Sequence, residues 1–210
     1  MYKALYLHGF RSSGQSATFR HLQRRYSHDF EWLSIDIDYG QNPIFTIRQV
    51  GQFVAQKRID VVVGTSMGGW LTDQLPSGPL KVVVNPVETP YDSIKRQYDE
   101  WIAEHPRAIT AELPIFGRKD KVCRVTPKLL EQYAKLPLPI SEIRDPNWYG
   151  FFSTHDETLH RTEADNLAIL EAANANIGPG HVILTDAIGH RCTPEFADTE
   201  LMPLILEHLK

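Results

Sequence analysis

A serine between two glycines is the group in this sequence best suited to act as a nucleophile. Gly64-Thr65-Ser66-Met67-Gly68 matches the pattern G-x-S-x-G and directly follows the largely β-branched run 59–63. A serine in this context lies on a sharp turn from a strand into a helix, which presents its hydroxyl at the carboxyl end of a sheet. The motif therefore predicts that Ser66 is the nucleophile of an acyl transfer.

A serine hydroxyl is a weak nucleophile at neutral pH and needs a general base. The chain contains nine histidines. In folds that carry this turn, the nucleophile, the acid and the histidine follow one another in that order along the chain. His190 lies between the last predicted strand and the C-terminal helix, and we therefore expect it to be the base.

The acid that orients the histidine is expected after the preceding strand. Asp156 follows the predicted strand 148–153 directly, where its carboxylate can accept a hydrogen bond from Nδ1 of His190. Glu157 is adjacent, and Asp120 also resembles an acid at the end of a strand. We prefer Asp156, and the alternatives stay open because geometry decides the acid, not position in the chain.

The developing oxyanion of such a reaction needs backbone N–H donors. One is expected from Met67, directly after the nucleophile, and the second from Phe10, after the predicted first strand. Arg11 follows Phe10, and its guanidinium either binds an anionic group of a substrate or is an ordinary solvated loop arginine.

Strands and short helices alternate along the first 85 residues, which is typical of a mostly parallel, doubly wound α/β sheet. We expect strands at residues 2–7, 32–37, 59–64, 81–84, 148–153 and 181–185. Helices are expected at residues 15–27, from Pro43 onward, at 67–75, at 161–175 and at the C-terminus. Proline-rich residues 86–147 break this rhythm, so we predict one domain, 1–210, with 86–147 as an inserted, partly helical cap or lid.

Composition narrows the class of protein further. Hydrophobic residues make up 42% and charged residues 23% of the 210, as in a globular enzyme, and the net charge of −4 argues against nucleic-acid binding. Two cysteines exclude a disulfide-rich scaffold. The absence of metal-binding and nucleotide-binding motifs predicts no metal and no other cofactor. No apolar run has the length of a membrane span, and no signal peptide is apparent at the start, so we expect a cytoplasmic protein.

The motifs together resemble a known family. Leu5-Tyr6-Leu7-His8-Gly9-Phe10, the turn at 64–69, Val82-Val83-Val84-Asn85-Pro86, Thr154-x-Asp156-Glu157 and Gly189-His190 are similar to the YqiA-like small bacterial esterases of the α/β-hydrolase superfamily. The resemblance covers the sheet well and residues 91–147 poorly. It implies a compact α/β-hydrolase fold, a triad of Ser66, Asp156 and His190, and ester or thioester substrates. Two residues depart from the family pattern: His155 replaces a glycine, and Arg11 replaces a polar residue.

The sequence therefore favours a serine esterase that cleaves small acyl esters through an acyl-enzyme intermediate. An acyl-CoA thioesterase is the alternative with the same groups, in which Arg11 and basic residues of the cap meet a phosphate-bearing leaving group. A non-catalytic α/β-hydrolase module that binds a small molecule or a protein is the alternative from another class.

Overall fold

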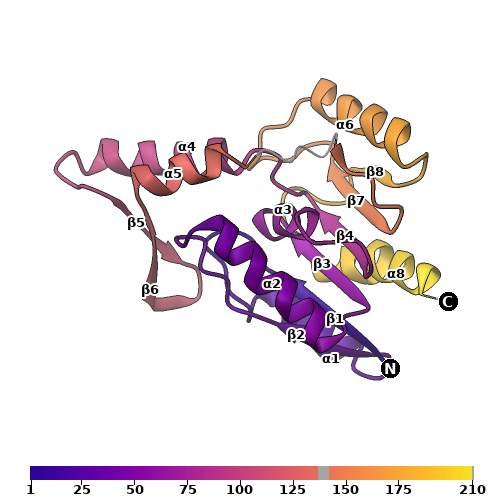
Figure 1. Ribbon diagram of the computed structural model, residues 1–210. Coiled ribbons are helices and arrows are strands. Elements are labelled where there is room, and N and C mark those ends of the chain that lie inside the picture. Colours follow the sequence, from indigo (N-terminus) through magenta and orange to yellow (C-terminus); the bar gives the residue numbers. More distant parts are fainter. Residues whose placement is uncertain (137–141, 210) are drawn as a thin grey trace.

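Six parallel strands form the centre of the computed structural model, which describes residues 1–136 and 142–209 (Figure 1). Residues 137–141, which belong to the expected cap, and residue 210 lie outside the described residues. The sheet order is β2-β1-β3-β4-β7-β8. The strand bounds are β1 Tyr2–Leu7, β2 Phe30–Ser34, β3 Val61–Thr65, β4 Leu80–Val84, β7 Trp148–Ser153 and β8 Val182–Thr185. The expected doubly wound parallel sheet is therefore confirmed.

Both faces of the sheet are covered by helices, as the continuous apolar runs of the strands require. Leu5 and Val62 point to the face that packs against α2 and α3, whereas Tyr6 and Val63 point to the face that packs against α1 and α8. Helix α6 covers the β7 end of the sheet. The helices are α1 Ala17–Arg25, α2 Pro43–Lys57, α3 Met67–Asp73, α6 Glu163–Asn176, α7 Pro194–Phe196 and α8 Met202–His208, the last preceded by a π-helical turn at Ala197–Leu201.

Local sequence signals set the beginnings of these helices. The Ser16 hydroxyl accepts a hydrogen bond from the Phe19 N–H, which caps α1, and Asn42 caps α2 immediately before Pro43. Proline suits the first helical position because the N–H that it lacks would have no partner there. Thr162 and Asp165 cap α6 reciprocally. These caps fix where each helix leaves the sheet edge that carries the candidate site.

The second strand lies earlier in the chain than the sequence suggests. We expected residues 32–37, but β2 spans Phe30–Ser34 and pairs with β1. The Ile37 N–H donates to Nε2 of the buried His8. This N–H is therefore not available for a hydrogen bond to a neighbouring strand. The chain therefore leaves the sheet before the apolar residues of this segment end.

The segment between β4 and β7 contains two helices and a two-stranded antiparallel hairpin. The elements are α4 Pro90–Glu104, β5 Ala111–Ile115, β6 Arg118–Val125 and α5 Pro127–Ala134. They project from one side of the sheet, beyond α2 (Figure 1). The hairpin was not expected from the sequence. Ala111 and Leu113 are buried and Glu112 is exposed, but Pro114 within β5 and the charged run of β6 disguise the alternation.

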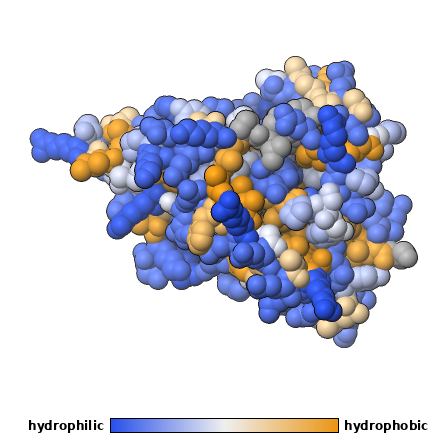
Figure 2. All heavy atoms as spheres, in the orientation of Figure 1, coloured by the Kyte–Doolittle hydropathy of each residue, from blue (hydrophilic) through white to orange (hydrophobic). Residues whose placement is uncertain are grey.

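The surface is largely hydrophilic on the face that Figure 2 shows, with hydrophobic atoms near its middle and at the projecting end. Three of the exposed large apolar side chains, Ile109, Phe116 and Val122, belong to the segment between β4 and β7. No helix in the described part of the chain has the length and apolar character that a bilayer span needs.

A buried carboxyl group lies at the end of the sheet opposite the nucleophile. Asp73 is the last residue of α3, and its Oδ1 accepts a hydrogen bond of 2.7 Å from the indole N–H of Trp148. Burial raises the pKa of Asp73 to about 7, although the bond from Trp148 and the charge of Lys81 favour the carboxylate. The folded protein therefore holds a proton here that the unfolded chain releases at lower pH.

We expect the contribution of Asp73 to the free energy of unfolding to fall as the pH rises from about 4 to about 7. In that range the folded state binds more protons than the unfolded state at Asp73, and each unit of pKa difference corresponds to about 1.4 kcal/mol. Urea denaturation at several pH values measures the slope, and Asp73→Asn, which keeps the acceptor for Trp148, should flatten it. An unchanged slope in Asp73→Asn would show that Asp73 does not titrate in this range.

Candidate active site

Ser66 occupies a strained turn between β3 and α3. Its φ of 54° and ψ of −121° place a non-glycine residue in a sparsely populated region, which costs about 1–3 kcal/mol. Surrounding backbone bonds hold it there: the Ser66 N–H donates to Val84 O at 3.1 Å, and its carbonyl accepts from Val87 and Trp70. The turn is therefore imposed by the end of β4 and the first turn of α3.

The glycines of the motif allow α3 to pack closely against the sheet. A Cβ at Gly68 would lie 2.0 Å from the carbonyl oxygen of Leu7 in β1, and a Cβ at Gly64 would lie 2.4 Å from the carbonyl oxygen of Gly68. Neither position can hold a side chain without moving the backbone. The spacing G-x-S-x-G is thus a packing requirement of this turn.

His190 lies between the serine and a carboxylate. Its Nε2 is 3.1 Å from Ser66 Oγ, and its Nδ1 is 2.8 Å from Asp156 Oδ2. The side chain of Asp156 is fully buried and that of His190 is 13% exposed. An ionised carboxylate only accepts hydrogen bonds, so Nδ1 of His190 carries a proton, and Nε2 faces the hydroxyl. The structure thus brings together the three residues that the sequence suggested.

The turn after β7 keeps the buried Asp156 ionised. Burial alone would raise the pKa of this carboxyl group, but hydrogen bonds from His190 and from the N–H groups of Leu159 and Thr158 bring it below its ordinary value. The two backbone N–H groups donate to Oδ1 at 2.8 and 2.9 Å, which leaves Oδ2 for the histidine. The carboxylate is therefore fixed in both charge and direction.

A buried arginine also lies beside this carboxylate, and sequence reasoning missed it. Nη1 of Arg161 is 3.9 Å from Asp156 Oδ2, Nε donates to Glu88 at 2.7 Å, and Nη2 donates to the carbonyl of Pro86. The guanidinium carbon lies 5.0 Å from the ring centroid of Phe152. An isolated arginine in a polar loop carries no sequence signal for this arrangement.

The two alternative acids lie elsewhere. Glu157 contacts the histidine through the main chain: its Oε2 accepts the His190 N–H at 2.9 Å. Asp120 lies on β6, its side chain is 74% exposed, and its nearest cation is Arg118 at 3.7 Å. The carboxylate that meets the imidazole is that of Asp156.

The two expected oxyanion donors flank the serine. Met67 is the first residue of α3, where an N–H has no acceptor within the helix. The loop that carries Phe10 lies against the nucleophile, because a Cβ at Gly9 would be 3.0 Å from Ser66 Cβ. The Phe10 N–H makes no hydrogen bond to the protein within residues 1–136 and 142–209.

Arg11 is bound to the segment between β4 and β7. Its Nη1 donates to Gln97 at 3.2 Å, its Nε donates to the carbonyl of Pro114 at 3.3 Å, and its guanidinium lies over the ring of Phe116. The Phe116 N–H also donates to the Arg11 carbonyl at 2.7 Å. The predicted contact with substrate stays a prediction, while these protein contacts fasten the loop after β1.

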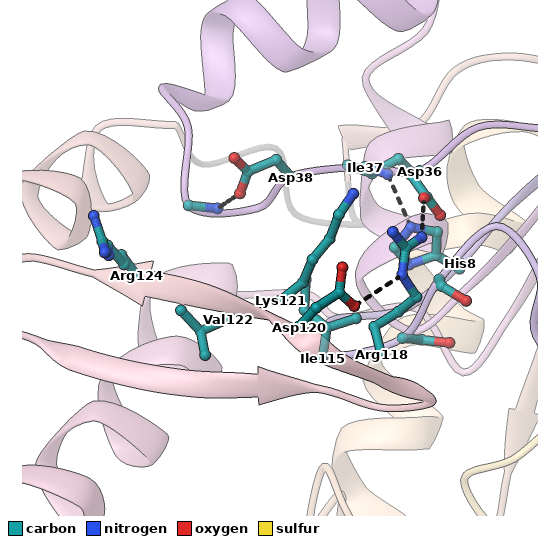
Figure 3. A pocket seen from close by; sticks show the side chains of 13 residues that line it. His8, Asp36, Ile37, Asp38, Ile115, Arg118, Asp120, Lys121, Val122 and Arg124 are labelled. Carbon is teal, nitrogen blue, oxygen red and sulfur yellow. Dashed lines mark hydrogen bonds and ion pairs between the residues drawn. The ribbon is translucent and has the colours of Figure 1, made fainter.

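A cavity of about 560 Å³ lies between the β5–β6 hairpin and the loops after β1 and β2 (Figure 3). His8 and Asp36 lie at one end of it and Arg124 at the other. Its two arginines pair with carboxylates: Arg118 donates to Asp36 at 2.8 Å, and Arg124 donates to Glu112 at 3.1 Å.

The described residues contain no group of three or more His, Cys, Asp or Glu side chains that would hold a metal ion.

A model of the uncharacterised protein family UPF0227 matches residues 3–123, more than half of the chain. The chain belongs to this family. The match spans the first three sheet strands, the nucleophile turn, β4, α4 and most of the hairpin, and it agrees with the YqiA-like resemblance noted above. No curated protein matches the chain.

Solved structures with the α/β-hydrolase fold are similar to this chain. It is similar to Est1E from Butyrivibrio proteoclasticus, solved with ferulic acid, at 11% identity and a TM-score of 0.66, over 100% of this chain and 90% of that one. It is also similar to the α/β-hydrolase GrgF from a Penicillium species, at 10% identity and a TM-score of 0.59, over 99% and 88%. An esterase from Pyrococcus furiosus matches at 13% identity and a TM-score of 0.60, over 99% and 80%. At these identities the likeness shows the fold alone, which confirms the α/β-hydrolase expectation.

We expect Asp156→Asn to be less stable than the wild type at neutral pH, by about 1–3 kcal/mol. Because the folded state depresses the pKa of Asp156, this contribution is present above the unfolded pKa near 3.9 and is lost as the pH falls below it. Denaturant titrations at pH 7 and pH 3 measure the difference, which should shrink at pH 3. Asp120→Asn, an exposed acid, is the control; an equal loss in both variants would contradict the assignment.

Proposed function

We propose that this protein is a serine hydrolase that cleaves carboxylic esters of small acyl substrates. The observation that carries the proposal is the hydrogen-bonded chain from Ser66 Oγ through His190 to the buried Asp156. A serine, a neutral imidazole and an ionised carboxylate in this order form the arrangement that activates a hydroxyl for attack on a carbonyl. A non-catalytic binding module of the same fold has no evident need for all three.

Each group has a defined role in the proposed reaction. Ser66 Oγ attacks the acyl carbonyl carbon while Nε2 of His190 takes the hydroxyl proton, and Asp156 stabilises the imidazolium that forms. The negative charge on the carbonyl oxygen is met by the N–H groups of Met67 and Phe10. The imidazolium then protonates the departing alcohol, which leaves an acyl-enzyme, and a water molecule activated in the same way releases the acid.

The segment 86–147 is proposed to cap this site. Its hairpin is fastened to the loop after β1, next to the proposed oxyanion donor, through Phe116 and Arg11. The cavity beneath the hairpin is lined mainly by polar and charged side chains. The residues that line this cavity do not include Ser66, Asp156 or His190.

The same machinery could act on acyl thioesters, although three arginines that could meet such a leaving group already bind groups of the protein. A CoA leaving group carries phosphates and calls for free cations near the site. Arg11, Arg118 and Arg124 are instead bound to Gln97, Asp36 and Glu112, respectively. Two of the structural neighbours described above are esterases or were solved with an aromatic acid, which agrees with the ester proposal without deciding it.

We expect Ser66→Ala to abolish hydrolysis of p-nitrophenyl acetate and butyrate, with a loss on the order of 10⁴-fold or more in kcat. A fluorophosphonate probe should label the wild type on Ser66, as located by peptide mass spectrometry, and should leave Ser66→Ala unlabelled. Full activity of Ser66→Ala toward every ester tested, or no labelling of folded wild type, would end the hydrolase proposal and favour a binding module.

Asp156→Asn should lower kcat on the order of 10³–10⁴-fold, because an amide at this position no longer selects the histidine tautomer with a free Nε2. The matched variant Asp120→Asn removes the rival carboxylate and should keep the wild-type rate. Steady-state kinetics on one ester compare the two. The reverse order of losses would make Asp120 the acid.

A further inference from the structure

A fully buried asparagine links two of the segments that carry the candidate catalytic groups. Asn85 directly follows β4, is 0% exposed and has a φ of 45°. Asparagine tolerates this left-handed conformation better than most residues do. Its own N–H donates to the Phe151 carbonyl of β7 at 2.8 Å, which fixes the backbone at the carboxyl edge of the sheet.

The side-chain amide of Asn85 reaches in two directions. Oδ1 accepts the N–H of Ser153 at 2.7 Å, at the end of the strand that leads to the acid. Nδ2 donates to the carbonyl of Gly189 at 2.8 Å and to the carbonyl of His190 at 3.2 Å. One side chain thus joins the acid strand to the loop of the base, 105 residues away in the chain.

This combination of contacts requires an amide. One oxygen faces an N–H donor, while the nitrogen faces two carbonyl acceptors, and among side chains of this size only asparagine supplies both. Aspartate would set a carboxylate oxygen against the two carbonyls, and an apolar side chain would leave all three backbone groups without partners in a buried place.

The peptide groups around His190 are held from both sides. The Glu157 carboxylate accepts a hydrogen bond from the His190 N–H, and the Asn85 amide donates one to the His190 carbonyl. The Ser153 hydroxyl donates to the Ile188 carbonyl at 2.6 Å, two residues before the histidine. With the backbone fixed in this way, the imidazole reaches Asp156 and Ser66 together without depending on the rigidity of an exposed loop.

We propose that Asn85 is a positioning residue that sets the place of His190 relative to Asp156 and Ser66. Its side-chain amide bonds to backbone groups, and it acts through the backbone of residues 189 and 190. The proposal rests on the proposed function. Displacement of a catalytic group by about 1 Å can lower a rate by about 100-fold, so the effect should be seen in turnover.

Two substitutions test it, because both suit a φ of 45° and leave the backbone unstrained. Asn85→Asp keeps the acceptor for Ser153 and replaces the donor to residues 189 and 190. Asn85→Gly removes the amide altogether, so it remains informative if the buried charge of Asn85→Asp prevents folding. Asn166→Asp is the matched control: Asn166 is 2% exposed and donates to the Ser153 carbonyl at 3.2 Å, but within residues 1–136 and 142–209 it makes no hydrogen bond to residues 189 and 190.

We expect Asn85→Asp and Asn85→Gly to lower kcat by about 100-fold with KM changed less than about threefold. Fluorophosphonate labelling of Ser66 should slow by a similar factor, and circular dichroism should show folded protein. Asn166→Asp should keep kcat within a few-fold of wild type. Wild-type kcat and labelling in folded Asn85 variants, or losses no larger than in Asn166→Asp, would overturn the proposal.

A spectroscopic measurement separates this proposal from the function it rests on. The His190 Nδ1 proton, hydrogen-bonded to Asp156, should give a far-downfield ¹H resonance that persists in Ser66→Ala and is lost or shifted in both Asn85 variants. If wild type neither hydrolyses esters nor reacts with the probe, the hydrolase proposal fails, while this resonance still decides the role of Asn85. An unchanged resonance in both variants would count against it.

Discussion

The site depends on one hydrogen bond between residues that are 124 positions apart, in which the Ser66 hydroxyl donates to His190 Nε2. This hydrogen bond forms only if the backbone holds both residues in the right places, because serine and histidine side chains are short. The parallel sheet meets this requirement: β3, β7 and β8 all end at the same edge, where the nucleophile, the acid and the base begin. The strand that precedes each group therefore determines where that group lies.

The same edge concentrates unfavourable local features that the surrounding structure has to offset. Ser66 and Asn85 both have positive φ values, and Asp156, Arg161 and Asn85 are buried polar groups. Hydrogen bonds from the surrounding structure offset these features. Asp156, for example, accepts hydrogen bonds from two backbone N–H groups and from an imidazole. Strain and buried charge in one place are expected where a structure is arranged for chemistry and not only for stability.

Sequence patterns predicted the features that depend on periodicity or on a local motif. The buried strand before Ser66, the strand at 148–153 and the order of serine, acid and histidine were all visible in the chain, and the structure brings the three side chains together. The contacts of Asn85 and Arg161 could not be predicted from the sequence. A side chain that bonds to the carbonyls of a distant loop produces no recognisable pattern in the chain. The β5–β6 hairpin was hidden by Pro114 and by its charged second strand.

The segment between β4 and β7 touches the site from two sides, which constrains how it can move. Next to the proposed oxyanion donor Phe10, the Phe116 N–H donates to the Arg11 carbonyl. Beside the proposed acid, Arg96 of α4 donates to the Thr158 carbonyl at 2.8 Å. Thr158 belongs to the turn whose N–H groups bind Asp156. A swing of the whole segment would break both contacts and loosen the loops of the oxyanion donor and the acid together. A movement of the segment as one body would therefore disturb the proposed catalytic geometry.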